Sequence, residues 1–148
     1  EICHTMVVCE VRPEKDDPDR TRITIGGNRI CYPGNVGTTT APLELVKLMI
    51  NSILSRQGAR FCTFDIANFY LCTPLDRPEY IKIKLSDILR EFITEYNLLH
   101  HVHNRWVYFE IRKGIYGLPQ SGILTQNLLA ERLAHKGYYQ CECTPGLW

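Results

Sequence analysis

Residues 114–122 read Gly-Ile-Tyr-Gly-Leu-Pro-Gln-Ser-Gly, and this stretch separates two segments of different periodicity. Residues 106–111 before it favour a strand, whereas residues 121–136 carry leucines at helical spacing and are followed by Gly137, a typical helix C-cap. Three glycines and a proline predict a tightly shaped loop that opens a helix. Such a loop favours a phosphate or a close backbone contact, although an ordinary strand–loop–helix connection is the more common alternative.

The rest of the chain also mixes strand and helix patterns. We expect a charged turn over 12–20, a hairpin turn at 26–28 and a loop over 33–40. The remaining patterns predict strands over 6–11, 21–25, 29–32, 60–66 and 80–84, and helices over 42–57 and 87–96. Pro42 and Ser86 are expected at the starts of these helices, and Gly58 at the end of the first. The fold class is therefore α+β, with a mixed or antiparallel sheet packed by amphipathic helices.

Composition excludes several classes of protein. The chain has 148 residues, of which 45% are hydrophobic and 22% are charged, so disordered and collagen-like sequences are excluded. No stretch approaches about 18 consecutive apolar residues, the length that a membrane-spanning helix needs. The net charge of +1 indicates no particular partner, and it does not exclude nucleic acid, because binding depends on where the cations lie.

The cysteines and histidines leave two interpretations open. Seven cysteines are an odd number, and the first residues, Glu1-Ile2-Cys3-His4, do not read as a secretory signal, so reduced intracellular thiols are expected. A histidine cluster and a cysteine pair could hold structural zinc, or they could be a solvated loop and thiols, and the usual zinc spacing is not met. These residues are His100, His101, His103, Cys141 and Cys143.

Asp65 is the first candidate for chemistry. It follows an apolar run in the predicted strand 60–66, which would bury the carboxylate near the strand end. A buried carboxylate needs a partner or a metal ion, because an unpaired buried charge is too costly. The alternative is a strand-end aspartate that caps a turn.

Two segments together resemble a known family. Phe64-Asp65-Ile66-Ala67-Asn68-Phe69-Tyr70 resembles motif A of reverse transcriptases, and Tyr116-Gly117-Leu118-Pro119-Gln120-Ser121-Gly122 resembles their motif B. Residues 65–75, 107–114 and 138–148 are similar to the polymerase of copia-like LTR retrotransposons. The resemblance covers roughly residues 20–148, and its motifs are specific in combination and in order.

The resemblance implies a partial right-hand polymerase, with fingers over about 1–58 and a palm with interleaved fingers over about 59–148. The family's motif C, which ends in two adjacent aspartates, is not found here, and no aspartate follows Asp87. We therefore expect motif C beyond Trp148 and no polymerisation by these 148 residues alone. A non-catalytic remnant that binds nucleic acid or another partner is the alternative function.

The implied parent synthesises DNA on an RNA or DNA template. Its partners would be a primer–template, dNTPs and the rest of a polyprotein that includes the remaining palm, RNase H and integrase. No membrane partner is expected. The location would be intracellular, in the cytoplasm, a virus-like particle or the nucleus.

Motif A supplies the implied catalytic centre. Asp65 would ligate Mg²⁺ (or Mn²⁺), and the backbone carbonyl of Ile66 would be an accessory ligand. Tyr70 occupies the steric-gate position, where an aromatic ring excludes a 2′-hydroxyl. Asn68 and Phe69 would turn their backbone N–H groups toward the triphosphate, with core packing as the alternative for Phe69.

Motif B and several basic residues complete the implied site. Gln120 would contact the incoming nucleotide, and Gly117, Pro119 and Gly122 would shape the loop. Arg22 resembles the fingers arginine that grips the triphosphate, with Lys15 or Arg20 as alternatives and a solvated strand arginine as the plainer interpretation. Four further cations would line a primer–template path, unless they lie on a solvated strand face: Lys82, Lys84, Arg112 and Lys113.

Overall fold

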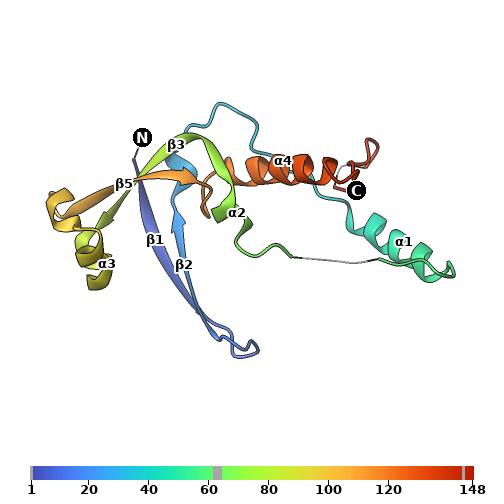
Figure 1. Cartoon of the computed structure of the whole chain (residues 1–148), viewed down its shortest axis with the longest axis horizontal. Helices are drawn as coiled ribbons and strands as arrows, with labels where there is room; N and C mark the ends of the chain where they lie inside the picture. The colour runs from blue at the N-terminus through green and yellow to red at the C-terminus, as the bar shows by residue number, and fades with distance from the viewer. Residues whose placement is uncertain (1, 62–64, 145) are drawn as a thin grey trace.

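The computed structural model describes residues 2–61, 65–144 and 146–148, and in these ranges the protein is α+β. Five strands form one mixed sheet in the order β2-β1-β3-β5-β4 (Figure 1). The strands are β1 (Ile2–Val11), β2 (Asp19–Ile25), β3 (Pro74–Lys84), β4 (Val102–His103) and β5 (Trp106–Lys113). The helices are α1 (Leu43–Leu54), α2 (Phe69–Cys72), α3 (Arg90–Glu95) and α4 (Ser121–Ala134), with 3₁₀ turns η1 (Gly27–Arg29), η2 (Leu85–Asp87) and η3 (Leu98–His101). The α+β class and the mixed sheet are confirmed.

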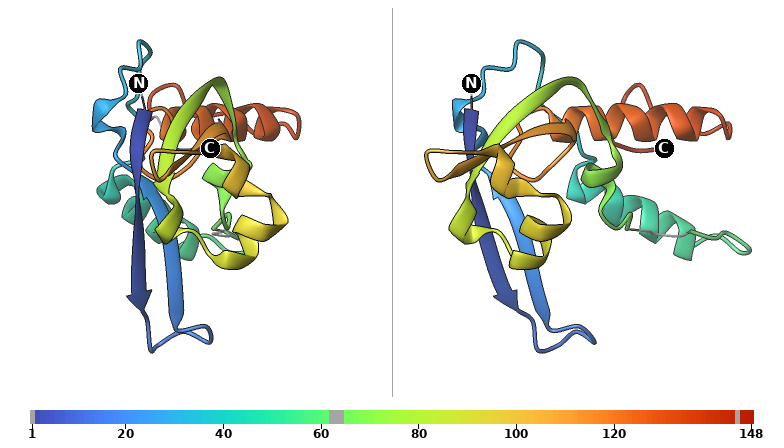
Figure 2. Two further views of the ribbon diagram at one scale, coloured as in Figure 1. Left: turned by 90° about the vertical axis from the view of Figure 1, so that its left-hand side faces the viewer. Right: turned by 60° about the vertical axis from the view of Figure 1, so that its left-hand side comes forward.

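Strand β1 joins the two parts of the sheet. Its outer half pairs antiparallel with β2, from Thr5 opposite Ile25 to Val11 opposite Asp19. Its first residues pair parallel with β3, where His4 lies opposite Lys82. Strand β5 then pairs antiparallel with β3. The two ends of the β1–β2 hairpin therefore differ, because one is held in the sheet and the other extends from it as an arm (Figures 1 and 2).

The predicted hairpin at 26–28 is wrong. Strand β2 pairs with β1 through the charged turn after Val11, and no return strand forms over 29–32. The reason is a contact with a distant loop: the Ile25 N–H donates to the Tyr116 carbonyl at 2.9 Å, and η1 follows. A Cβ on Gly27 would lie 1.8 Å from the Gly117 carbonyl oxygen, so this glycine serves a close approach rather than a hairpin.

The three predicted helices form, but their predicted ends are confirmed only in part, since α1 ends at Leu54 and not at Gly58. Helix α1 begins after Pro42, as expected. Helix α4 ends in a Schellman motif, in which the Tyr138 N–H donates to the Leu133 carbonyl and Gly137 has φ +82°. Ser86 does not cap α3, because its hydroxyl donates to the Asp87 carboxylate and η2 occupies this position; the helix begins at Arg90.

The core is small and lies on one face of the sheet. Its fully buried apolar cluster consists of Cys3, Ile25, Ile81 and Leu118. The accessible surface is 11457 Å². A compact monomer of 17.1 kDa would expose about 7,800 Å² by the usual size scaling. The chain therefore leaves a large share of its apolar surface open.

Two helices account for part of this open surface. Helix α1, predicted over 42–57, has no buried residue and stands away from the sheet (Figures 1 and 2). On α4 the buried residues are Ser121 and Thr125, whereas the leucines at helical spacing are only half-buried. Those leucines are Leu124, Leu128, Leu129 and Leu133.

The segment predicted as the buried strand 60–66 is only partly described, since residues 62–64 lie outside the described residues. Arg60, Phe61, Asp65 and Ile66 belong to no strand and are exposed. The burial predicted for Asp65 is therefore wrong. Within the described ranges, no helix has the length and apolar character that crossing a membrane requires.

Candidate functional site

A cavity of about 370 Å³ brings the two quoted segments together. Residues that follow Asp65 form one side, Tyr116 of the 114–122 loop forms another, and α4 closes the third. The lining residues are Asp65, Ile66, Phe69, Tyr70, Tyr116, Thr125 and Leu129. Four residues predicted from motif A therefore share this cavity with Tyr116, the first residue of the segment that resembles motif B.

A left-handed residue and a single helical turn place the aromatic side chains. Asn68 has φ +54°, a conformation that asparagine adopts more readily than most residues, and the chain then enters α2. Asn68 itself is exposed and its side chain makes no capping hydrogen bond. Phe69 and Tyr70, the first residues of α2, are half-buried and line the cavity.

A buried pair of threonine hydroxyls ties α2 to α4. The Thr73 hydroxyl donates to the Phe69 carbonyl at 2.9 Å and accepts from the Thr125 hydroxyl at 3.1 Å. The Thr73 carbonyl accepts from the Gly114 N–H at 2.8 Å. Both threonines are buried, so these bonds form in an environment where an unmade bond is costly. This threonine latch, Thr73 and Thr125, fixes the distance between α2 and α4.

The two tyrosines of the cavity pack edge to face. The ring centroids of Tyr70 and Tyr116 are 5.5 Å apart at an interplanar angle of 65°. A Cβ at Gly114 would lie 2.6 Å from the Tyr70 carbonyl oxygen, so the approach of the loop to α2 requires a glycine there. The tyrosine pair gives the cavity one rigid aromatic wall.

Asp65 can offer a carboxylate to a cation at the open side of the cavity. Mg²⁺ is commonly held by one or two carboxylates together with water and substrate phosphates. Asp65 is the only acidic residue among the described lining residues, and the described ranges contain no cluster of three or more His, Cys, Asp or Glu side chains suited to a metal. A single exposed carboxylate does not fit a metal pair.

Gln120 is not among the residues that line this cavity. Its side chain is fully buried, and its Nε2 donates to Glu79 Oε1 at 2.9 Å. Glu79 also accepts from Arg77 Nε at 2.9 Å, and Arg77 donates in turn to the Cys31 carbonyl. Gln120 Oε1 has no hydrogen-bond partner. Glu79 was not predicted from the sequence, where the only signal was a carboxylate directly before the alternating strand 80–84.

The loop residues have distinct roles. Gly117 has φ +96°, and a Cβ there would lie 2.0 Å from the Ile25 carbonyl oxygen, so the loop requires glycine at this position. Pro119 lies beside Gly27, where its ring would contact any added Cβ. Gly122 lies within α4 rather than in the loop.

The predicted triphosphate arginine is outside the cavity lining. Arg22 lies on β2, where its guanidinium contacts Glu10 of β1 at 3.3 Å. Arg20 lies on the same strand and Lys15 in the turn at the end of the hairpin arm. The structure thus places all three basic candidates on the β1–β2 hairpin.

The four cations of the predicted nucleic-acid path lie on β3 and β5. Lys82 and Lys84 both approach the ring of Trp106, which confirms that they share a strand face. Arg112 donates to Glu110 at 2.6 Å, and this bond raises the pKa of the guanidinium above its ordinary value. The fourth cation, Lys113, ends β5 opposite Pro74.

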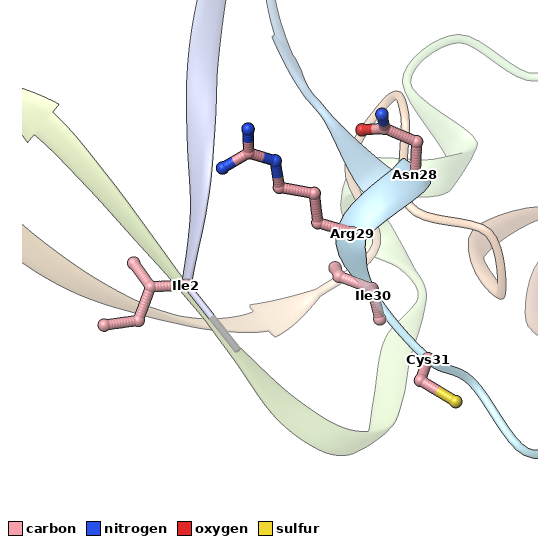
Figure 3. A pocket seen from close by; sticks show the side chains of 5 residues that line it. All are labelled: Ile2, Asn28, Arg29, Ile30 and Cys31. Atoms are coloured by element: carbon pink, nitrogen blue, oxygen red, sulfur yellow. The ribbon is translucent and has the colours of Figure 1, made fainter.

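A separate pocket of about 580 Å³ lies beside η1 and contains none of the predicted site residues. Figure 3 shows the Arg29 side chain directed toward β1 and away from the Cys31 thiol. The remaining lining residues are Ile2, Asn28 and Ile30. Among the described residues that line this pocket, Arg29 is the one charged side chain.

The chain matches no protein-family model, no curated protein and no solved structure.

Proposed function

We propose that the chain is a segment of an RNA-directed DNA polymerase of the LTR-retrotransposon type, whose parent transfers nucleotides with two metal ions. The observation that supports this most strongly is the shared cavity, in which Asp65 and Tyr70 lie with Tyr116 from a distant part of the sequence. A polymerase needs a carboxylate and an aromatic ring close together, because the metal ion and the sugar of the incoming nucleotide must bind side by side.

In this proposal the residues of the two motifs have defined tasks. Asp65 and the Ile66 carbonyl would hold Mg²⁺ or Mn²⁺, which would supply positive charge next to the phosphate oxygens. Tyr70, supported by the Tyr116 ring, excludes a ribose 2′-hydroxyl by shape. Asn68 and Phe69 direct backbone N–H groups toward the phosphates. Gln120 reaches a nucleotide only after exchanging its bond to Glu79.

These 148 residues do not provide a second catalytic carboxylate in the order that the family uses. The only adjacent aspartates are Asp16 and Asp17, which lie in the turn of the β1–β2 hairpin. A single carboxylate cannot hold two metal ions in the required geometry. We therefore infer that polymerisation needs residues beyond this sequence, together with a primer–template, dNTPs and the remaining polyprotein, in the cytoplasm, a virus-like particle or the nucleus.

A non-catalytic module that binds nucleic acid or another partner is the second candidate. Two features favour this second candidate: Asp65 is exposed and the core is small. Neither feature requires the chain to be a catalyst. The reading frame after Trp148 distinguishes the two. An Asp-Asp pair within about thirty residues, following a strand pattern, supports the polymerase by family resemblance, and a stop codon there supports the module.

The functional test uses the gene product extended through that frame. Primer extension with Mg²⁺ and dNTPs should occur for the extended wild type and be lost in Asp65→Asn. Asp87→Asn is the matched control, because Asp87 lies in η2 and does not line the cavity. Extension that persists in Asp65→Asn would refute the role proposed for this carboxylate.

A further inference from the structure

Helix α1 is apolar on most of its sides, yet it has no buried residue. Eight of its 12 residues are hydrophobic, and a helix of this kind normally lies in a core. Leu45, Leu48 and Met49 share one side at positions i, i+3 and i+4, and all three are exposed, Leu48 by 63%. An isolated helix of this length is marginal in water, so α1 requires a partner surface to remain folded.

An open groove of about 490 Å³ lies between the β1–β2 arm and the segment around α3. One face of the arm forms its first side, because Val7 of β1 lies opposite Ile23 of β2 and both line the groove. Phe92 of α3 and Tyr96, the residue that follows α3, line the other side and are 46% and 60% exposed. The groove therefore presents apolar and aromatic side chains to solvent.

The floor of this groove is the open end of the core. Ile83 and Phe109 line the groove, and both also pack against the buried cluster that contains Ile81. Ile83 lies two residues after Ile81 on β3, so the two side chains point to the same face of the sheet. An apolar helix seated in the groove would extend this core and exclude water from it.

The α1 helix of the same chain does not reach the groove. Figure 1 shows α1 and α3 at opposite ends of the longest axis of the molecule. The helix can enter such a groove only on a second molecule, and each copy offers one helix and one groove. Two reciprocal contacts related by a twofold axis use both surfaces of both copies and close the assembly at a dimer.

The area that these contacts would bury matches what a stable dimer needs. Helix α1, with 12 residues, is about 18 Å long. If half of its surface enters the groove, two reciprocal contacts bury about 1,500 Å², within the range of about 1,200–2,000 Å² for specific interfaces. The chain exposes about 3,700 Å² more than a compact monomer of its mass, so ample surface is available for this burial.

We propose that the chain forms a symmetric dimer in which α1 of each copy occupies the groove between the β1–β2 arm and α3 of the other copy. Leu45, Leu48 and Met49 enter the groove and contact Phe92 and Tyr96. This is helix-in-groove recognition, in which apolar residues at positions i, i+3 and i+4 anchor the helix. The dimer goes beyond the proposed polymerase, because it uses none of the residues that line the Asp65 cavity.

Sedimentation equilibrium of the chain over a range of concentrations tests the dimer. The fitted mass should rise with concentration from 17.1 kDa toward twice that value. Leu48→Glu and Phe92→Glu should each weaken dimerisation by about tenfold or more, because each places a carboxylate in an apolar contact. Leu99→Glu is the matched control and should leave dimerisation unchanged, because Leu99 is 65% exposed but belongs neither to α1 nor to the groove lining. Circular dichroism verifies that each variant folds.

A mixture of two variants distinguishes the reciprocal contact from other dimers. A chain with Leu48→Lys keeps its groove, and a chain with Phe92→Glu keeps its helix. Their mixed dimer contains one intact helix–groove contact and one contact in which the two substituted side chains carry opposite charges. The mixture should therefore dimerise about tenfold more tightly than either variant alone.

Four results would overturn the proposal. The first three are the mass of one chain at every concentration, a dimer that Phe92→Glu leaves intact, and a mixture that associates no better than its components. The fourth is an extended gene product that stays monomeric while its α1 amides exchange more slowly than in the 148-residue chain, since the added residues would then cover α1. Dimerisation should persist in Asp65→Asn, whereas primer extension should not, so the failure of either proposal is recognised independently of the other.

Discussion

Substituting Gly117 by alanine should disrupt the junction between the 114–122 loop and β2. The added Cβ would lie 2.0 Å from the Ile25 carbonyl oxygen and 3.0 Å from the Ile25 nitrogen, so the backbone must separate. This separation breaks the hydrogen bond from the Ile25 N–H to the Tyr116 carbonyl. The bond contributes about 1 kcal/mol, and the left-handed φ of +96° adds about 1–2 kcal/mol for alanine.

The expected loss is therefore about 2–3 kcal/mol in the free energy of unfolding. Gly137→Ala is the matched control, because Gly137 has φ +82° but no atom within 4 Å of an added Cβ. It should cost only the conformational component, about 1–2 kcal/mol. Urea unfolding measures both variants, and amide exchange at Ile25 should accelerate in Gly117→Ala alone. Equal losses with unchanged exchange at Ile25 would refute this account of the junction.

Three further perturbations test other contacts. Thr125→Val removes the donor of the threonine latch and should lower the free energy of unfolding by about 1–2 kcal/mol in urea, whereas Thr125→Ser should retain most of it; equal effects would contradict the latch. Gln120→Glu places a second carboxylate against Glu79 and should destabilise the fold by several kcal/mol at pH 7, and an unchanged urea midpoint would contradict the buried contact. The Tyr32 hydroxyl donates to Asp76 at 2.7 Å, which raises the Tyr32 pKa; this contribution to stability is present below pH 10 and is lost as pH rises through the raised pKa. Asp76→Asn should lower that pKa in an NMR titration, and no change would contradict the assignment.

Features governed by neighbouring residues could be predicted from the sequence. The alternation over 80–84 predicted part of β3, and the leucine spacing with Gly137 predicted α4 and its end. These patterns work because side-chain direction follows the local backbone period.

Features governed by distant contacts could not be predicted. The sequence Gly26-Gly27-Asn28 has the composition of a hairpin turn, but Gly27 is required by the 114–122 loop. The inward face of α4 is polar because Thr125 meets Thr73, a residue on a different element. The same limitation applies to Gln120, whose partner Glu79 lies on β3.

The candidate site was predicted in part. Asp65, Ile66, Phe69 and Tyr70 do share a cavity, because the one-turn helix α2 keeps residues close in sequence together in space. The exposure of Asp65 was not predicted, since an apolar run before a carboxylate does not determine whether other segments cover it.

The position of a bound cation tests the central claim most directly. Mn²⁺ added to the chain with a dNTP should broaden the NMR signals of Ile66 and Tyr70, and this broadening should disappear in Asp65→Asn. Broadening centred on Asp16 and Asp17 instead, or broadening at Ile66 that survives Asp65→Asn, would contradict a metal-binding role for Asp65.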